Sequence, residues 1–201
     1  TSTQQWMLLL QCFYDDKAAI EDILNYMKGE FPALSSINYV INPKANDTIT
    51  HEEIICVHGA PYIEEEMEGL RFRIHPKSFY QTNSEQAHTL YSFTRDFCEL
   101  KGNERVYDLY TGTGTIAQFV AKNAKEVIGI EYVKEAIEDA KTNAKLNGID
   151  NCKFFAGDMK DVLNDTFIAD HGAADVVIVD PPRTGMHKNV VETLLRLNAP
   201  K

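Results

Sequence analysis

The chain has 201 residues, of which 44% are hydrophobic and 25% are charged, as expected for one large or two small globular domains. No apolar run approaches the roughly 20 residues of a membrane span, and no secretory signal opens the chain. These features exclude membrane-spanning and disordered classes, and we expect a cytoplasmic protein with no membrane partner.

The net charge is −10, so the chain is by composition a poor binder of polyanions. A nucleic-acid substrate would have to be held by local basic residues. The four cysteines are too far apart in sequence for a CxxC pair or a metal knuckle, and we expect reduced thiols and no metal site. They are Cys12, Cys56, Cys98 and Cys152.

Residues 1–76 are predicted to form a small α+β domain. The apolar run Trp6–Tyr14 indicates a buried strand. Apolar residues then follow helical spacing and predict an amphipathic helix that Gly29 can end. These residues are Ile20, Ile23, Leu24 and Met27. Strands are predicted at 37–41 and 54–57, separated by a polar, turn-rich segment at 43–50.

Two further segments belong to this predicted domain. The acidic run Glu64–Glu66 is interpreted as a solvated face. At 70–74, apolar and arginine residues alternate, which is the period-two pattern of a half-buried strand.

After Pro76 the pattern changes to alternating strands and helices. Asn83 or Ser84 can cap a helix whose predicted apolar face carries Ala87, Leu90, Tyr91, Thr94, Phe97 and Cys98. Strands follow at 106–109, 127–130, 153–156 and 175–179, separated by helical patterns at 116–123, 133–147 and 159–168. This alternation predicts an α/β fold, a Rossmann-like, mostly parallel sheet in a domain over 77–201.

A glycine turn follows the first of these strands. Gly112 and Gly114 permit positive φ and close approach of a ligand, and the next helix directs its amides toward that ligand. With Ala117, the turn also fits the relaxed fingerprint of dinucleotide-binding proteins. Asp108, four residues before Gly112, favours another ligand, because an acid there can bind a cationic amino group directly or through water. That property suits the methionyl end of S-adenosyl-L-methionine.

Two acids follow the next two strands. Glu131 can accept hydrogen bonds from both ribose hydroxyls, although it could also be a helix N-terminal acid. Asp158 can accept from the adenine amino group, although an ordinary turn aspartate is the plain alternative.

The fourth strand runs into Asp180-Pro181-Pro182-Arg183. The prolines predict a rigid extended loop that holds the Asp180 carboxylate at the mouth of the site. Many methyltransferases that act on amino groups have an aromatic residue after the two prolines. Arg183 in that position argues for another acceptor atom.

Taken in order, these motifs resemble the RNA (uracil-5-)-methyltransferase family. The resemblance rests on segments 75–83, 108–115, 129–131 and 180–185, and it covers residues 70–201 strongly and 1–69 loosely. It implies a class I methyltransferase domain preceded by the family's central α+β domain. It also implies a cofactor, S-adenosyl-L-methionine, and an RNA substrate (rRNA or tRNA) for RNA modification.

The resemblance also implies a cofactor site. That site carries over to Gln81, Tyr110, Thr115, Glu131, Asp158 and Asp180, to which the glycine turn adds Gly112. Basic residues near these motifs are candidate RNA contacts; they are Arg73, Lys77, Arg183 and Lys188.

The resemblance leaves the chain without catalytic residues of its own. The family's nucleophilic cysteine stands in a Ser-Cys-Asn-Pro motif on the next strand, and its general base is a glutamate further on. Both are expected beyond Lys201, so the methyltransferase domain is expected to be truncated. We therefore expect the chain to bind the cofactor without turning over alone.

Three alternatives stay open at this point. The first is an oxidoreductase that binds a nicotinamide cofactor at the glycine turn. The second is a non-catalytic module that binds S-adenosyl-L-methionine or RNA. The third is a methyltransferase that acts on a base amino group, which needs no cysteine.

Overall fold

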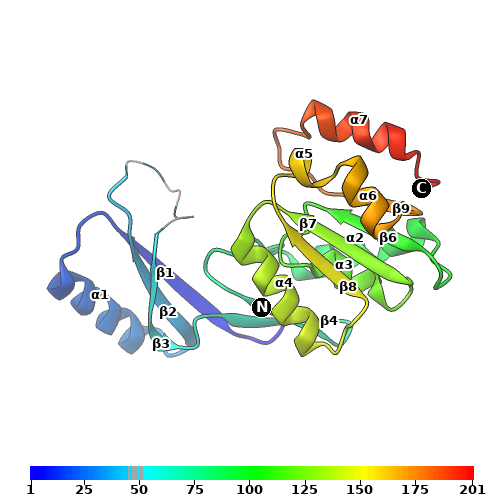
Figure 1. Cartoon of the computed structure of the whole chain (residues 1–201). Coiled ribbons are helices and arrows are strands. Elements are labelled where there is room, and N and C mark those ends of the chain that lie inside the picture. The colour runs from blue at the N-terminus through cyan, green and yellow to red at the C-terminus, as the bar shows by residue number, and fades with distance from the viewer. Residues whose placement is uncertain (45, 47–48, 50–51) are drawn as a thin grey trace. The chain divides into compact units, whose positions relative to one another are not determined.

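The computed structural model describes residues 1–44, 46, 49 and 52–201 (Figure 1). The predicted turn-rich segment at 43–50 lies largely outside the described residues. The chain divides into two compact units, Thr1–Glu66 with Phe72–Phe79, and Met67–Arg71 with Tyr80–Lys201. The domain boundary after Pro76 stays a prediction.

The first unit contains a three-stranded sheet covered by one helix. Its elements are β1 (Trp6–Cys12), α1 (Lys17–Glu30), β2 (Leu34–Ile41) and β3 (Ile54–Gly59). Strand β1 pairs parallel to β2, and β3 pairs antiparallel to β2. Helix α1 packs Ile20 and Leu24 onto Ile37 of the sheet. The predicted α+β character of this part is thus present.

The predictions for β1 and α1 were wrong in detail. Trp6 is 60% exposed and Tyr14 is 75% exposed, so the run Trp6–Tyr14 is not a buried strand. Gly29 lies inside α1, which ends at Glu30, and the C-cap residue Phe31 donates its N–H to the carbonyl of Met27. Pro32 explains this end, because the residue before a proline is pushed out of the helical region.

A hairpin follows, formed by β4 (Ile63–Met67) and β5 (Leu70–Ile74). Its two turn residues, Glu68 and Gly69, both have positive φ, as a tight primed turn requires. The solvated-face interpretation of Glu64–Glu66 was wrong. Glu65 is 2% exposed and accepts a hydrogen bond from the N–H of Ser2 at 2.5 Å. The run is a strand, so alternate side chains point inward.

The second unit is built on a four-stranded parallel sheet of order β8-β7-β6-β9. The strands are β6 (Arg105–Leu109), β7 (Glu126–Glu131), β8 (Cys152–Ala156) and β9 (Val176–Val179). The helices are α2 (Ser84–Cys98), α3 (Thr115–Ala121), α4 (Lys134–Leu146), α5 (Met159–Val162), α6 (Asp165–His171) and α7 (Lys188–Leu197).

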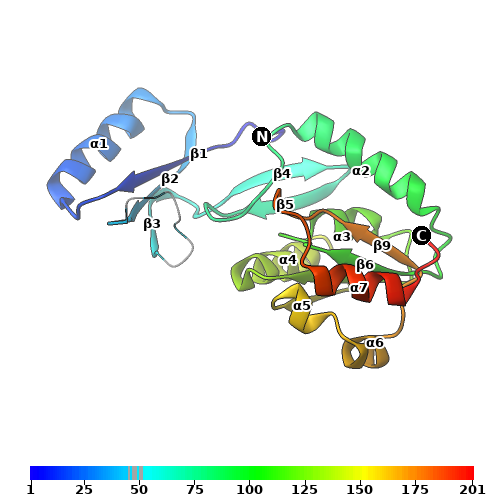
Figure 2. The ribbon, with the colours of Figure 1, turned by 90° about the horizontal axis from the view of Figure 1, so that it is seen from above.

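Helices cover both faces of this sheet, as Figure 2 shows for α2 and α3 on one side and α6 and α7 on the other. Alternate residues of β6 explain the layers. Val106 packs with α2, α3 and α4, whereas Tyr107 and Leu109 pack with α5, α6 and α7. The predicted α/β fold with a parallel sheet is confirmed.

Two helix predictions in this unit needed correction. On α2, Ala87, Tyr91 and Cys98 are buried, but Leu90 is 54% exposed and Phe97 is 80% exposed. The helical pattern at 159–168 is two short helices, because Asn164 caps a new helix by accepting from the N–H of Phe167. No helix in the described ranges has the length and hydropathy needed to cross a membrane.

Candidate functional site

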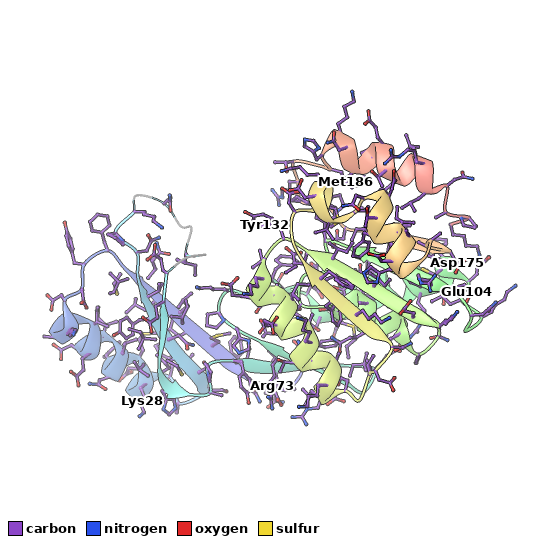
Figure 3. The ribbon with its side chains drawn as sticks, viewed as in Figure 1. Lys28, Arg73, Glu104, Tyr132, Asp175 and Met186 are labelled. Atoms are coloured by element: carbon purple, nitrogen blue, oxygen red, sulfur yellow. The ribbon has the colours of Figure 1, made fainter. Side chains whose placement is uncertain are left out.

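The carboxyl ends of the four parallel strands meet at one edge of the sheet. Figure 3 shows Tyr132 and Met186 at this edge, with Glu104 and Asp175 at the opposite edge. Main-chain hydrogen bonds hold neighbouring strand ends together, from Tyr110 N–H to Ile130 and from Asp180 N–H to Leu109. The edge thus collects Tyr110, Gly112, Thr115, Glu131, Asp158 and Asp180, which are six of the seven predicted site residues.

The glycine turn between β6 and α3 needs both of its glycines. Gly112 has φ 54° and Gly114 has φ 74°, a region that side chains disfavour. A Cβ on Gly114 would stand 2.9 Å from the Ala140 Cβ and 2.9 Å from Phe154 Cε1, so only glycine fits. A Cβ on Gly112 would meet nothing within 4 Å. The turn is therefore closely packed at Gly114 and has open space beside Gly112.

Asp108 is buried beneath this turn. Its Oδ2 accepts from the Thr111 hydroxyl at 2.5 Å and from the Ala117 N–H at 3.0 Å. Burial raises the pKa of Asp108 to about 7, with smaller contributions from Asp180 and Glu131. Because Asp108 is 1% exposed, the predicted direct contact with a ligand amino group was wrong, and the contact through water stays a prediction. Asp108 instead anchors the glycine turn to the first turn of α3.

Glu131 bridges the end of β7 to two other segments. Its Oε2 accepts from the Gly112 N–H at 3.2 Å, and its Oε1 accepts from the Val133 N–H at 3.0 Å. Val133 is the N-cap residue of α4, so the helix-start interpretation is realised. The contact with Gly112 also places the carboxylate beside the open glycine turn, as a ribose ligand requires.

Asp158 lies after β8 and caps the short helix α5. It accepts from the Lys160 N–H at 3.2 Å and pairs with Lys160 Nζ at 2.7 Å. Hydrogen bonds from Lys160 lower the pKa of Asp158, so it is a carboxylate at neutral pH. The turn-aspartate interpretation is realised, and the carboxylate also lines a cavity.

That cavity has a volume of about 280 Å³. It is lined by Tyr110, Tyr132, Asp158, Met159, His187 and Val190. Two of these residues follow a predicted site residue directly in the sequence, Tyr132 after Glu131 and Met159 after Asp158. Sequence reasoning missed them, although that adjacency was a usable signal. It also missed His187 and Val190, which reach the cavity through the loop after Pro182 and through α7.

The remaining predicted residues occupy different environments. Thr115 is the first residue of α3 and is 6% exposed, with its hydroxyl 3.3 Å from that of Thr113. Asp180 is exposed, and after burial its charge is the next cause that raises the pKa of Tyr91, on α2, to about 12. Gln81 lies in an irregular segment before α2 and is half-buried.

The polar groups at the carboxyl edge of the sheet match those of S-adenosyl-L-methionine. The edge offers the carboxylates of Glu131, Asp158 and Asp180, which match the ribose hydroxyls and the amino groups of that cofactor. Burial first, and then the charges of Asp158 and Glu131, raise the pKa of Tyr110, which lines the same cavity as Asp158. The glycine turn leaves room at Gly112 for close approach. These residues fit the cofactor.

Comparison with known proteins agrees with this geometry. The family model described as "Methyltransferase domain" matches residues 100–200, which contain the whole parallel sheet. The chain belongs to the methyltransferase-domain family. A tRNA (uracil-54, C5)-methyltransferase of Pyrococcus abyssi, solved with S-adenosyl-L-homocysteine, superposes with a TM-score of 0.70 at 32% identity. That match covers 86% of this chain and 41% of the archaeal chain.

Two curated relatives are similar over nearly the whole chain. An uncharacterized RNA methyltransferase of Porphyromonas gingivalis is 59% identical over 97% of this chain, and one of Bacteroides thetaiotaomicron is 52% identical over 97%. This chain spans 42% and 44% of their lengths. The family match and the archaeal complex confirm S-adenosyl-L-methionine as the predicted cofactor of this domain.

Proposed function

We propose that this chain is the cofactor-binding part of an RNA methyltransferase that transfers a methyl group to C5 of uridine in rRNA or tRNA. The observation that carries the proposal is the carboxyl edge of the sheet, where an open glycine turn lies beside Glu131 and next to the cavity that contains Asp158. The archaeal uracil-54 enzyme, 32% identical in sequence, supports the choice of C5 as the acceptor.

Each predicted site residue has a proposed role in binding the cofactor. Glu131 accepts from the ribose hydroxyls, and Asp158 accepts from the adenine amino group. Gly112 lets the main chain approach the ligand. The residues proposed to complete the site are Gln81, Tyr110, Thr115 and Asp180.

The charge of the edge argues against a nicotinamide cofactor. A dinucleotide would place its pyrophosphate at the glycine turn, which Asp108 underlies through its hydrogen bond with the Ala117 N–H. Glu131 does not separate the two cofactors, because dinucleotide-binding proteins also bind a ribose with an acid at this place. Phosphate beside a carboxylate is repelled, whereas the cationic sulfonium and ammonium groups of S-adenosyl-L-methionine are attracted.

Methylation at C5 of uracil needs a nucleophile, because C5 is too weakly nucleophilic alone. A thiolate adds to C6, and C5 then takes the methyl group from the sulfonium, which leaves as the thioether. A base removes the C5 proton, and the thiolate leaves C6 as the C5–C6 double bond re-forms. Burial raises the pKa of Cys98, and raises that of Cys152 to about 12, so both thiols stay protonated. We assign no catalytic residue within these 201 residues and expect cofactor binding without turnover.

The proposed RNA contacts are local, since the chain is acidic. Arg183 is exposed in the loop after Asp180, whereas Lys188, the first residue of α7, has its Nζ 3.5 Å from Glu192 Oε1. Arg73 is engaged elsewhere in the first unit, where its Nε lies 3.3 Å from Glu64 Oε1. Arg183 is therefore the basic residue we favour for an RNA contact next to the site.

The acceptor atom can be tested in the intact protein that carries these residues. Transfer to C5 displaces the C5 hydrogen, so RNA labelled with [5-³H]uridine should release one tritium for each methyl group transferred. Methyl transfer without tritium release would point to another acceptor, such as a base amino group, and would overturn the proposal.

A further inference from the structure

The cavity at the carboxyl edge has the composition of a pocket for a flat base. Tyr110 and Tyr132 supply aromatic surface from the ends of β6 and β7. Met159 and Val190 supply apolar surface and are 4% and 1% exposed. Besides the hydroxyls of the two tyrosines, Asp158 and His187 supply the side chains that can form strong hydrogen bonds with a base edge.

The ring of His187 is held by the start of α7. Its Nδ1 accepts from the Asn189 N–H at 3.2 Å, which makes His187 the N-cap of that helix. A nitrogen that accepts a hydrogen bond carries no proton, so the proton of the neutral ring is on Nε2. Within the described residues Nε2 has no protein partner, which leaves it as a donor.

Asp158 supplies the hydrogen-bond acceptor of the cavity. Its carboxylate accepts hydrogen bonds only, and Lys160 keeps it ionised. Besides the two tyrosine hydroxyls, the cavity therefore contains one acceptor and one donor, on Asp158 and His187, and two aromatic rings also line it.

This pair matches one purine edge and opposes another. Adenine presents an N6 amino donor beside the N1 acceptor, whereas hypoxanthine presents an O6 acceptor beside an N1–H donor. We propose that His187 is a specificity-determining residue that donates to the adenine ring while Asp158 accepts from its amino group. The inference rests on the proposed cofactor site and adds to it the residue that completes recognition of the base.

The test compares two ligands by isothermal titration, S-adenosyl-L-homocysteine and its deaminated analogue S-inosyl-L-homocysteine. The variant His187→Ser keeps a side chain that can cap α7 but removes the Nε2 donor. We expect the wild type to prefer the adenine ligand by at least about tenfold, the effect of mismatching a hydrogen-bond pair that the bound base shields from water. We expect His187→Ser to lose about tenfold in affinity for the adenine ligand and little for the deaminated one.

The matched control is Asn164→Ser, which changes the N-cap of α6, a helix that contributes no lining residue to the cavity. It should leave both affinities unchanged. If His187→Ser loses the same affinity for both ligands, or keeps both affinities unchanged, the inference is overturned. His187 would then act only as the N-cap of α7. If the wild type binds neither ligand, the proposed cofactor site fails and the inference fails with it.

Discussion

Glu131 Oε2 accepts a hydrogen bond from the main-chain N–H of Gly112 at 3.2 Å, which joins the end of β7 to the glycine turn after β6. The same carboxylate accepts from the Val133 N–H at the start of α4. One side chain therefore fixes the turn and the start of a helix, and it is the side chain that we propose binds the ribose. Binding and local order are expected to depend on it together.

Replacing Glu131 with alanine should weaken S-adenosyl-L-methionine binding by more than tenfold. A charge-assisted hydrogen bond of this kind contributes about 1.5–3 kcal/mol. Isothermal titration measures the change, and Glu138→Ala is the control, since it removes an exposed acid from α4. Unchanged affinity in a folded Glu131→Ala protein would remove Glu131 from the ribose site.

Asp108 should make stability depend on pH. Burial raises its pKa in the folded protein to about 7 from an ordinary value near 3.8, so the folded state binds the extra proton between these values. Its contribution to the free energy of unfolding is complete below about pH 4 and is lost as pH rises through about 7.

The variant Asp108→Asn should remove that dependence, because an amide does not titrate here. Urea unfolding from pH 4 to pH 8 should show the wild type losing more stability than the variant as pH rises. Subtracting the free energy of unfolding of the variant from that of the wild type at each pH removes the contribution of every other titrating group. Parallel curves would contradict the buried, proton-binding role of Asp108.

The two turn glycines should differ in their response to alanine. Gly112→Ala adds a side chain in open space and should cost about 1–2 kcal/mol for positive φ. In Gly114→Ala the new Cβ also collides with Ala140 and Phe154, which should lower the free energy of unfolding by about 1–3 kcal/mol more. Urea denaturation measures both, and equal losses would contradict the close packing behind Gly114.

Asp180→Ala should impair methyl transfer in the intact protein, because the exposed carboxylate after β9 stands at the mouth of the proposed site. The initial rate of methyl transfer to RNA measures this effect. Asp161→Ala, which removes an exposed acid from α5, is the control and should leave the rate unchanged. A normal rate in Asp180→Ala would exclude Asp180 from the site.

The parallel sheet and the edge that carries the candidate site could be predicted, because the sequence patterns that indicate them are local. Short apolar strands alternating with helices require a parallel sheet, and parallel strands bring the residues that follow them to one edge. The positions of Glu131 and Asp158 at this edge could be predicted in this way. The direct ligand contact predicted for Asp108 was wrong, because the sequence places it at a strand end but does not reveal that its carboxylate turns inward.

Other features depend on contacts that no local pattern encodes. The sequence presents Glu65 as part of a solvated charge run, but it is buried on the inward side of β4 and accepts a hydrogen bond from the Ser2 N–H. Leu90 and Phe97 have the spacing of a core face but are exposed on α2. His187 reaches the cavity because of how the loop after Pro182 folds, and spacing alone does not show this.

The most direct test of the account is isothermal titration of the 201-residue chain with S-adenosyl-L-methionine, S-adenosyl-L-homocysteine and NADH. We expect binding of the two adenosyl ligands at a Kd in the micromolar range, which corresponds to about −8 kcal/mol, and no binding of NADH. Binding of NADH, or of none of the three by a folded chain, would contradict a methyltransferase cofactor site within these residues.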